Sequence, residues 1–160
     1  MRIKNTLAIL MIVLAQFAVS QVTYEWDDYG VGFQVAEDFQ DISQGAAQWE
    51  LISSDGLIYI SVTPWSDASI TIDDLEDATL GIAFDMIFES DAEVDGDCGE
   101  INDFDGCYVV GAVSGEEYEL FLVALLMDVD SDTNIQVVMG FNEGDVDEVV
   151  GILSSFYAYD

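Results

Sequence analysis

The chain has 160 residues, with 33 acidic side chains, two basic ones and no histidine, and its formal charge is −31 at pH 7. Both basic residues lie within the first four positions, so residues 21–160 contain no Lys, Arg or His. This composition excludes catalysis by a Ser–His or Cys–His pair. It also excludes nucleic acid and anionic membrane surfaces as direct partners, because neutralising phosphate requires Lys or Arg. Since 51% of the residues are hydrophobic, we expect a folded chain and not a disordered acidic one.

The first 20 residues have the pattern of a signal peptide. Two basic residues precede an apolar run from Leu7 to Ala15, and small residues occupy positions −3 and −1 before Gln21. The run is shorter than the roughly 20 residues that a membrane span needs. We therefore expect residues 1–20 to be removed and residues 21–160 to form a single secreted or periplasmic domain, retention as an N-terminal anchor being the alternative.

The acidic residues are spread along the chain and do not form one block. Without basic side chains, carboxylates are offset only by water, hydrogen-bond donors, helix N-termini or bound cations. Self-repulsion of this size destabilises a compact state in dilute buffer, and salt relieves it. The even spread favours a halophilic surface with cations as counter-ions, and a dedicated cation-binding protein is the alternative.

The first elements predicted are a strand and a hairpin. The segment YGVGFQV, residues 29–35, is typical of a strand. Residues 37–44 are polar and irregular, and we expect at most one helical turn there. Apolar runs at 48–53 and 57–63 flank Ser54-Asp55-Gly56, whose Asp and Gly favour a tight turn, so these runs predict a β-hairpin.

Two later segments have helical spacing. The first, about residues 72–88, has Thr71 as a cap with Asp74 three residues on, and acids in its first turn. Its expected inward face is Ile72, Leu75, Thr79, Ile82, Ala83 and Met86. The second begins at Asp145, with Glu148 three residues on. Its expected stripe is Val146, Val149, Val150, Leu153 and Phe156.

Three strongly apolar runs lie between the helices, at 106–113, 118–127 and 135–141. The first two are joined by Ser114-Gly115-Glu116-Glu117, a short turn that favours antiparallel pairing. The sequence therefore predicts an α+β domain, in which a mainly antiparallel sheet packs against two amphipathic helices as an α/β/α sandwich.

This order of elements resembles the PsbP-like and Mog-type superfamily over Tyr29 to Tyr159. The segments that carry the resemblance are YGVGFQVAEDF, YISVTPW, GCYVVGAV and the closing ILSSF. The resemblance implies a scaffold that is usually non-enzymatic and binds proteins. The basic surfaces that some members use are absent here, so it names no particular partner.

Cys98 and Cys107 are the only cysteines, and export would place them in an oxidising compartment. We expect a structural disulfide across a short hairpin, which would contribute roughly 2–3 kcal/mol in the loop-entropy model. A free thiol pair and a pair of metal ligands are the alternatives. The nearby acids, Asp91, Asp95, Asp97, Asp103 and Asp105, are interpreted as a solvated loop.

The stretch DVDSDTN carries the best candidate for a metal site. Asp128, Asp130 and Asp132 match the first acidic positions of an EF-hand loop, but Thr133 and Met139 stand where Gly and Glu are required. The flanking runs also have the pattern of strands. We interpret the stretch as a hairpin loop. A weak calcium site of another geometry, with Asp128, Asp130, Asp132 and Asn134 as ligands, is the alternative.

Several aromatic residues are candidates for a pocket lining, although most are expected in the core. They are Trp26, Tyr29, Trp49, Trp65, Tyr157 and Tyr159. Trp65 follows Pro64 at the end of a predicted strand, where it could face a ligand.

The sequence thus favours a secreted or periplasmic, non-enzymatic domain that binds a protein or a small molecule in saline conditions. It predicts no catalytic residue and no cofactor apart from the weak calcium alternative. A calcium-dependent adhesion or matrix module is the second hypothesis. A carboxylate-based hydrolase is the third, because paired acids can hydrolyse glycosides.

Overall fold

The computed structural model describes residues 21–36, 39–66, 69–128 and 134–159. The strands are β1 (Gln21–Trp26), β2 (Val31–Ala36), β3 (Phe39–Gln44), β4 (Trp49–Ser53), β5 (Tyr59–Pro64), β6 (Val94–Ile101), β7 (Phe104–Ala112), β8 (Leu120–Met127), β9 (Asn134–Phe141) and β10 (Tyr157–Ala158). The helical elements are η1 (Ile72–Asp74), α2 (Leu75–Met86), η2 (Glu143–Asp145) and α3 (Val146–Leu153). Neither helix of this described part is long and apolar enough to cross a membrane.

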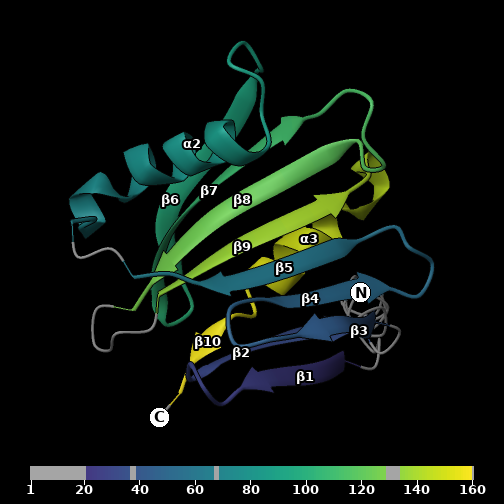
Figure 1. The fold of residues 1–160 in the computed structure, drawn as a ribbon, viewed down its shortest axis with the longest axis vertical. Helices are drawn as coiled ribbons and strands as arrows, with labels where there is room; N and C mark the ends of the chain where they lie inside the picture. Colours follow the sequence, from purple (N-terminus) through teal and green to yellow (C-terminus); the bar gives the residue numbers. More distant parts are fainter. Residues whose placement is uncertain (1–20, 37–38, 67–68, 129–133, 160) are drawn as a thin grey trace, which may run out of the picture.

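The strands form two antiparallel sheets. The larger has the order β3-β4-β5-β9-β8-β7-β6, and the smaller has the order β1-β2-β10. In Figure 1, α2 lies in front of the large sheet and α3 lies behind it. The α+β class, with an antiparallel sheet between helices, is confirmed.

Alternation along the central strands divides the core between the two faces of the large sheet. On β8, Leu122, Ala124 and Leu126 belong to the main core with α3 and the small sheet. The intervening Val123 and Leu125 belong to the clusters under α2. Both sets are buried. Each face of β8 is covered, and this explains why the strand is apolar along its whole length.

The helices bury fewer of the expected residues than their spacing predicts. In α2 the buried residues are Leu75, Thr79 and Ala83, whereas Met86 at its end is 57% exposed. In α3, Val149, Ile152 and Leu153 are buried, and the expected stripe residues Val146 and Val150 are 40% and 52% exposed. Ile72 is also exposed, at 46%. Both helices rest on the sheet with a narrow face, so the wider predicted stripes were wrong at their margins.

Some segments differ from the prediction. The irregular segment expected at 37–44 is wrong over its described part, because residues 39–44 form β3 and pair with β4. The acidic loop around the cysteines is in fact a hairpin, with Asp95 and Asp97 on β6 and Asp105 on β7. The strands β1 and β10 are additional to those predicted.

Candidate binding site

A cavity of about 640 Å³ lies where β5 ends and β9 begins. Its walls come from four separate parts of the chain: the β1–β2 turn, the β3–β4 turn, the end of β5 and the start of β9. The lining residues that bear on its chemistry are Asp28, Tyr29, Ala46, Thr63, Trp65 and Asn134. The volume is within the range of small-ligand sites, roughly 300–1,000 Å³.

Backbone and side-chain hydrogen bonds hold these walls together. The Trp65 backbone N–H donates to the Asn134 carbonyl oxygen at 3.0 Å, which extends the β5–β9 pairing by one residue. The Tyr29 hydroxyl donates to the Ala46 carbonyl oxygen, so the β1–β2 turn is tied to the β3–β4 turn. The cavity is therefore formed by segments that are anchored to one another.

Two polar atoms of the lining residues are buried without a hydrogen-bond partner. They are the indole Nε1 of Trp65 and the side-chain Oδ1 of Asn134, and each lacks a partner in the part of the chain that the structure describes. Leaving a buried donor or acceptor unpaired costs about 1–3 kcal/mol. One donor and one acceptor thus remain unpaired beside the same cavity.

The predicted aromatic candidates divide between cavity and core. Trp65 and Tyr29 line the cavity. Trp26 and Trp49 are each 3% exposed and pack edge-to-face against one another in the main core, so they are not available to a ligand. The Trp49 Nε1 is already paired, because it donates to Asp41 Oδ1 at 2.7 Å.

Tyr157 and Tyr159 lie apart from this cavity. Their hydroxyls donate to Glu25 Oε1 and Asp27 Oδ1, each at 2.8 Å, and so pin the C-terminal residues to β1 and the turn that follows it. These two tyrosines therefore have a structural role in the small sheet.

A hydrogen-bonded polar cluster occupies the sheet face beside the cavity. Glu50 accepts hydrogen bonds from the Tyr59 hydroxyl and from Ser43 Oγ, and Gln48 Nε2 donates to Ser61 Oγ at 2.8 Å. This is the α2 face of the sheet, since Ser61 pairs with Val138, which packs in the cluster under that helix. In Figure 1 no described helix lies in front of β4 and β5 on this face of the sheet.

The cluster shifts the pKa values of its two ionisable members in opposite directions. The hydrogen bond from Tyr59, followed by that from Ser43, lowers the pKa of Glu50. Burial, followed by the hydrogen bond to Glu50, raises the pKa of Tyr59 to about 12. The folded state therefore binds the Tyr59 proton more tightly than the unfolded state does, since the unfolded value is 10.0.

We expect Tyr59→Phe to flatten the alkaline loss of stability. The stabilisation linked to the Tyr59 proton is complete below pH 10 and is lost as pH rises from 10 toward 12. At about pH 8 the free energy of unfolding of the variant should be about 1 kcal/mol lower, because it lacks the hydrogen bond to Glu50. Between pH 10 and 12 it should then lose less stability than the unmodified chain, as measured by urea unfolding at a series of pH values.

Tyr159 is the internal comparison for this experiment. Burial and its hydrogen bond to Asp27 also raise its pKa to about 12. The loss of stability between pH 10 and about 12 should therefore be reduced in Tyr59→Phe but not abolished. It should be smaller still in the double variant that also carries Tyr159→Phe. An unchanged alkaline slope in Tyr59→Phe would show that the Tyr59–Glu50 pair does not form in solution.

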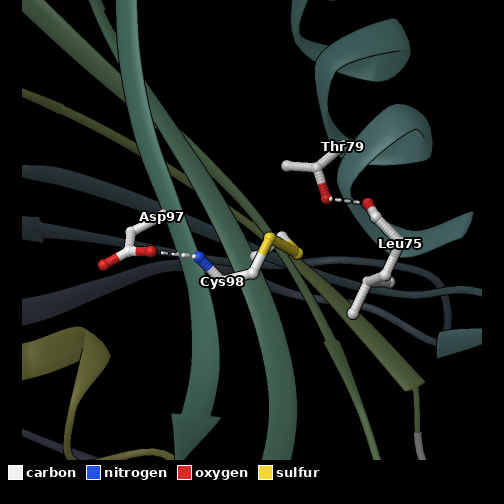
Figure 2. The surroundings of a disulfide bond; sticks show 5 residues. Leu75, Thr79, Asp97 and Cys98 are labelled. Atoms are coloured by element: carbon white, nitrogen blue, oxygen red, sulfur yellow. Dashed lines mark hydrogen bonds between the residues drawn. A yellow bond between two sulfur atoms is a disulfide. The ribbon is translucent and has the colours of Figure 1, made fainter. Parts of the chain in front are cut away.

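The two cysteines are joined by a disulfide bond. Cys98 on β6 lies directly opposite Cys107 on β7, with Cα atoms 4.1 Å apart. Cys107 is buried with Leu75 and Leu125, and Figure 2 shows the bond on the side of the sheet that faces α2. The bond ties the outermost strand to the core beneath α2, and neither thiol is free for a metal or a nucleophilic reaction.

The calcium prediction falls mostly outside the described residues. Asp130 and Asp132 are not among them, whereas Asp128 ends the β8 side of the loop and Asn134 begins β9. Within the described ranges no three acidic or Cys side chains are grouped closely enough to hold a metal ion. The weak calcium site stays a prediction.

Two of the described carboxyl groups, those of Glu50 and Asp55, are poorly suited to act as the general acid of a hydrolase. A general acid near neutral pH needs a raised pKa. Glu50 and Asp55 both have lowered pKa values, Asp55 because it accepts hydrogen bonds from the Ser53 hydroxyl and the Leu57 backbone. Hydrogen bonds to the ionised form thus favour the charged state of both groups, and neither is suited to donate a proton near neutral pH.

No protein-family model matches this sequence, and no curated protein matches it. Solved structures do match its fold. The Ran-binding protein Mog1p of Saccharomyces cerevisiae superposes with a TM-score of 0.62 at 14% identity, over 89% of this chain and 97% of Mog1p. The cyanobacterial PsbP of Synechocystis superposes with a TM-score of 0.60 at 13% identity, over 88% of this chain and 94% of that protein.

A third match comes from a protein of Bacteroides thetaiotaomicron. Its structure superposes with a TM-score of 0.58 at 10% identity, and the match covers 86% of this chain and 48% of the other. All three identities are low, so the comparisons establish the fold alone. The chain has a PsbP/Mog-like fold, which confirms the resemblance in the sequence.

Proposed function

We propose that this chain is an exported, non-enzymatic binding domain, adapted to saline surroundings, that recognises a protein partner through the cavity and the polar sheet face beside it. The observation that carries the proposal is the cavity itself, which has anchored walls and two unpaired polar atoms in its lining residues. Natural proteins leave few buried polar groups unpaired, and an unpaired group at a cavity calls for an explanation. A bound partner provides one.

A structural neighbour and the composition of the chain both support a binding role. Mog1p, which shares this fold, is a Ran-binding protein. This chain has no His, Lys or Arg in residues 21–160, so most catalytic constellations are unavailable to it. Without basic side chains in residues 21–160, the domain has no basic surface, so its partner is not one that binds to such a surface.

The signal-peptide pattern and the acidic surface support export into a saline medium. The positive N-terminal residues, the short apolar run and the small residues before Gln21 fit the pattern of a cleaved signal peptide. Acidic side chains that are spread over the whole domain remain hydrated at high salt, where their mutual repulsion is screened within about 3 Å.

The proposal is tested by site-directed photocrosslinking in the organism that makes the protein. A photoreactive residue replaces Thr63 at the cavity, and in a matched strain it replaces Asp147 on the far helix α3. We expect a discrete adduct outside the cytoplasm from position 63, competed by added purified domain, and none from position 147. The proposal would be overturned by adducts of equal yield from both positions, by no adduct from either, or by a protein that remains uncleaved in the cytoplasm.

A further inference from the structure

We infer that the cavity at the ends of β5 and β9 binds an extended peptide segment carrying a Lys or Arg side chain. A peptide group pairs with Trp65 Nε1 and Asn134 Oδ1, and the cationic side chain lies toward Asp28. This inference rests on the proposed function and goes beyond it, since it names the chemistry of the partner and the residues that read it.

The two unpaired atoms select an amide. Trp65 Nε1 can only donate and Asn134 Oδ1 can only accept. A peptide segment offers both carbonyl oxygens and N–H groups, so it carries a partner for each of the two atoms. Both residues are partly buried, and both contribute to the lining of the cavity.

The charge of the site selects a cationic peptide. Asp28 is exposed at the cavity, and no basic side chain exists anywhere in residues 21–160 to bind an anion. Trp65 and Tyr29 add aromatic faces, which attract Lys and Arg within about 6 Å of the ring. The excess of carboxylates over the whole domain also speeds the approach of a cation and slows that of an anion.

Prior order in the walls lowers the cost of binding. The Trp65–Asn134 backbone bond and the Tyr29–Ala46 bond already fix the segments that carry the recognition groups. A ligand therefore orders itself and two side chains and does not have to order the four wall segments.

The test follows the three Trp indole N–H signals of ¹⁵N-labelled protein by NMR in about 1 M NaCl, where nonspecific attraction is screened. The probe is the blocked pentapeptide acetyl-Gly-Gly-Arg-Gly-Gly-amide. Its controls are the same peptide with uncharged citrulline for Arg, and methylguanidinium chloride. We expect the Arg peptide to shift the Trp65 indole signal saturably. The signals of Trp26 and Trp49, which lie in the core, should not move.

Variants assign the effect to the recognition groups. Asp28→Asn should lower the affinity for the Arg peptide by about threefold to fivefold. The citrulline peptide should bind the unmodified protein more weakly than the Arg peptide by a similar factor. Glu100→Gln, which removes the same charge on the exposed outer strand β6, should leave affinity unchanged. Asn134→Ala should weaken binding by about fivefold or more without lowering the melting temperature, because it removes an unpaired buried acceptor.

The outcomes separate this inference from the proposed function. No saturable Trp65 shift up to roughly 10 mM peptide would overturn it, even where crosslinking at position 63 had identified a partner. Equal affinity for the Arg and citrulline peptides would overturn the inference that the site recognises a cationic side chain. Equal affinity for methylguanidinium and the peptide would overturn the amide pairing and indicate a free organic cation as the ligand.

Discussion

The melting temperature of residues 21–160 should rise by about 10 °C or more between about 0.05 M and about 1 M NaCl. The reason is that 33 acidic side chains share a domain without a single Lys, Arg or His. Their repulsion acts over the Debye length, which falls from more than 10 Å to about 3 Å across this range. The measurement is thermal unfolding followed by circular dichroism at constant pH.

A charge-reduced variant is the matched control. Glu93→Gln, Asp95→Asn, Glu100→Gln and Asp103→Asn remove four exposed carboxylates around the β6–β7 hairpin without changing side-chain size. The combined variant should melt higher than the unmodified domain at low salt and gain less from added NaCl. A melting temperature that does not depend on salt in either protein would contradict the halophilic interpretation of the surface.

Calcium distinguishes the remaining alternative for DVDSDTN. If the stretch is only a turn, CaCl2 at matched ionic strength should add no saturable rise in melting temperature beyond its general screening. If it is a calcium site, the rise should saturate, because a ligand that binds the native state stabilises it according to its concentration relative to Kd. Asp130→Asn should then abolish that rise.

The elements that the sequence predicted well are those buried on a regular pattern. The strands β7, β8 and β9 are apolar runs because both of their faces are covered, and short turns or loops fix their antiparallel order. The β4–β5 hairpin was readable from Asp55-Gly56, and Gly56 does have a positive φ of 75°. Burial and turn chemistry are local properties, and local properties can be read from one sequence.

Of the strands that the prediction missed, β3 lacks such a pattern and β10 is too short to show one. In β3 only Phe39 is buried, and Ile42 is the one apolar residue among the other five, so the sequence of this edge strand has no alternating apolar pattern. The strand β10 has two residues, and its pairing depends on Gly32 in β2, where a Cβ atom would lie 2.3 Å from the Tyr157 ring. β1 does alternate, with Val22, Tyr24 and Trp26 turned inward, but its partner is decided by tertiary packing.

The candidate site was predictable only in part. The position of Trp65 after Pro64 marked it as a possible ligand-facing residue, and Tyr29 was among the aromatic candidates. Asp28 could not be placed beside Trp65, because its approach depends on the packing of the small sheet against the large one. The unpaired state of Asn134 Oδ1 is likewise a property of the assembled site, and no spacing in the sequence encodes it.

Phe33→Ala should lower the free energy of unfolding by about 3–5 kcal/mol, as the loss of a fully buried Phe does in other cores. Phe33 is 0% exposed, and its ring stacks on Phe156 with centroids 4.7 Å apart and meets the edge of Trp49 at 5.5 Å. It thus joins the small sheet, the segment after α3 and the large sheet. Urea unfolding measures the loss, and Ile42→Ala, at a side chain 54% exposed on β3, should change stability by less than about 0.5 kcal/mol.

The milder Phe33→Leu connects this packing to the site. Leu keeps an apolar side chain in the core but cannot stack on Phe156, so the domain should stay folded while the small sheet loosens. The β1–β2 turn of that sheet carries Asp28 and Tyr29, which form one wall of the cavity. Phe33→Leu should therefore lower the affinity for the Arg peptide, although residue 33 does not line the cavity. A variant that loses stability but binds the peptide with unchanged affinity would show that the small sheet does not position this wall.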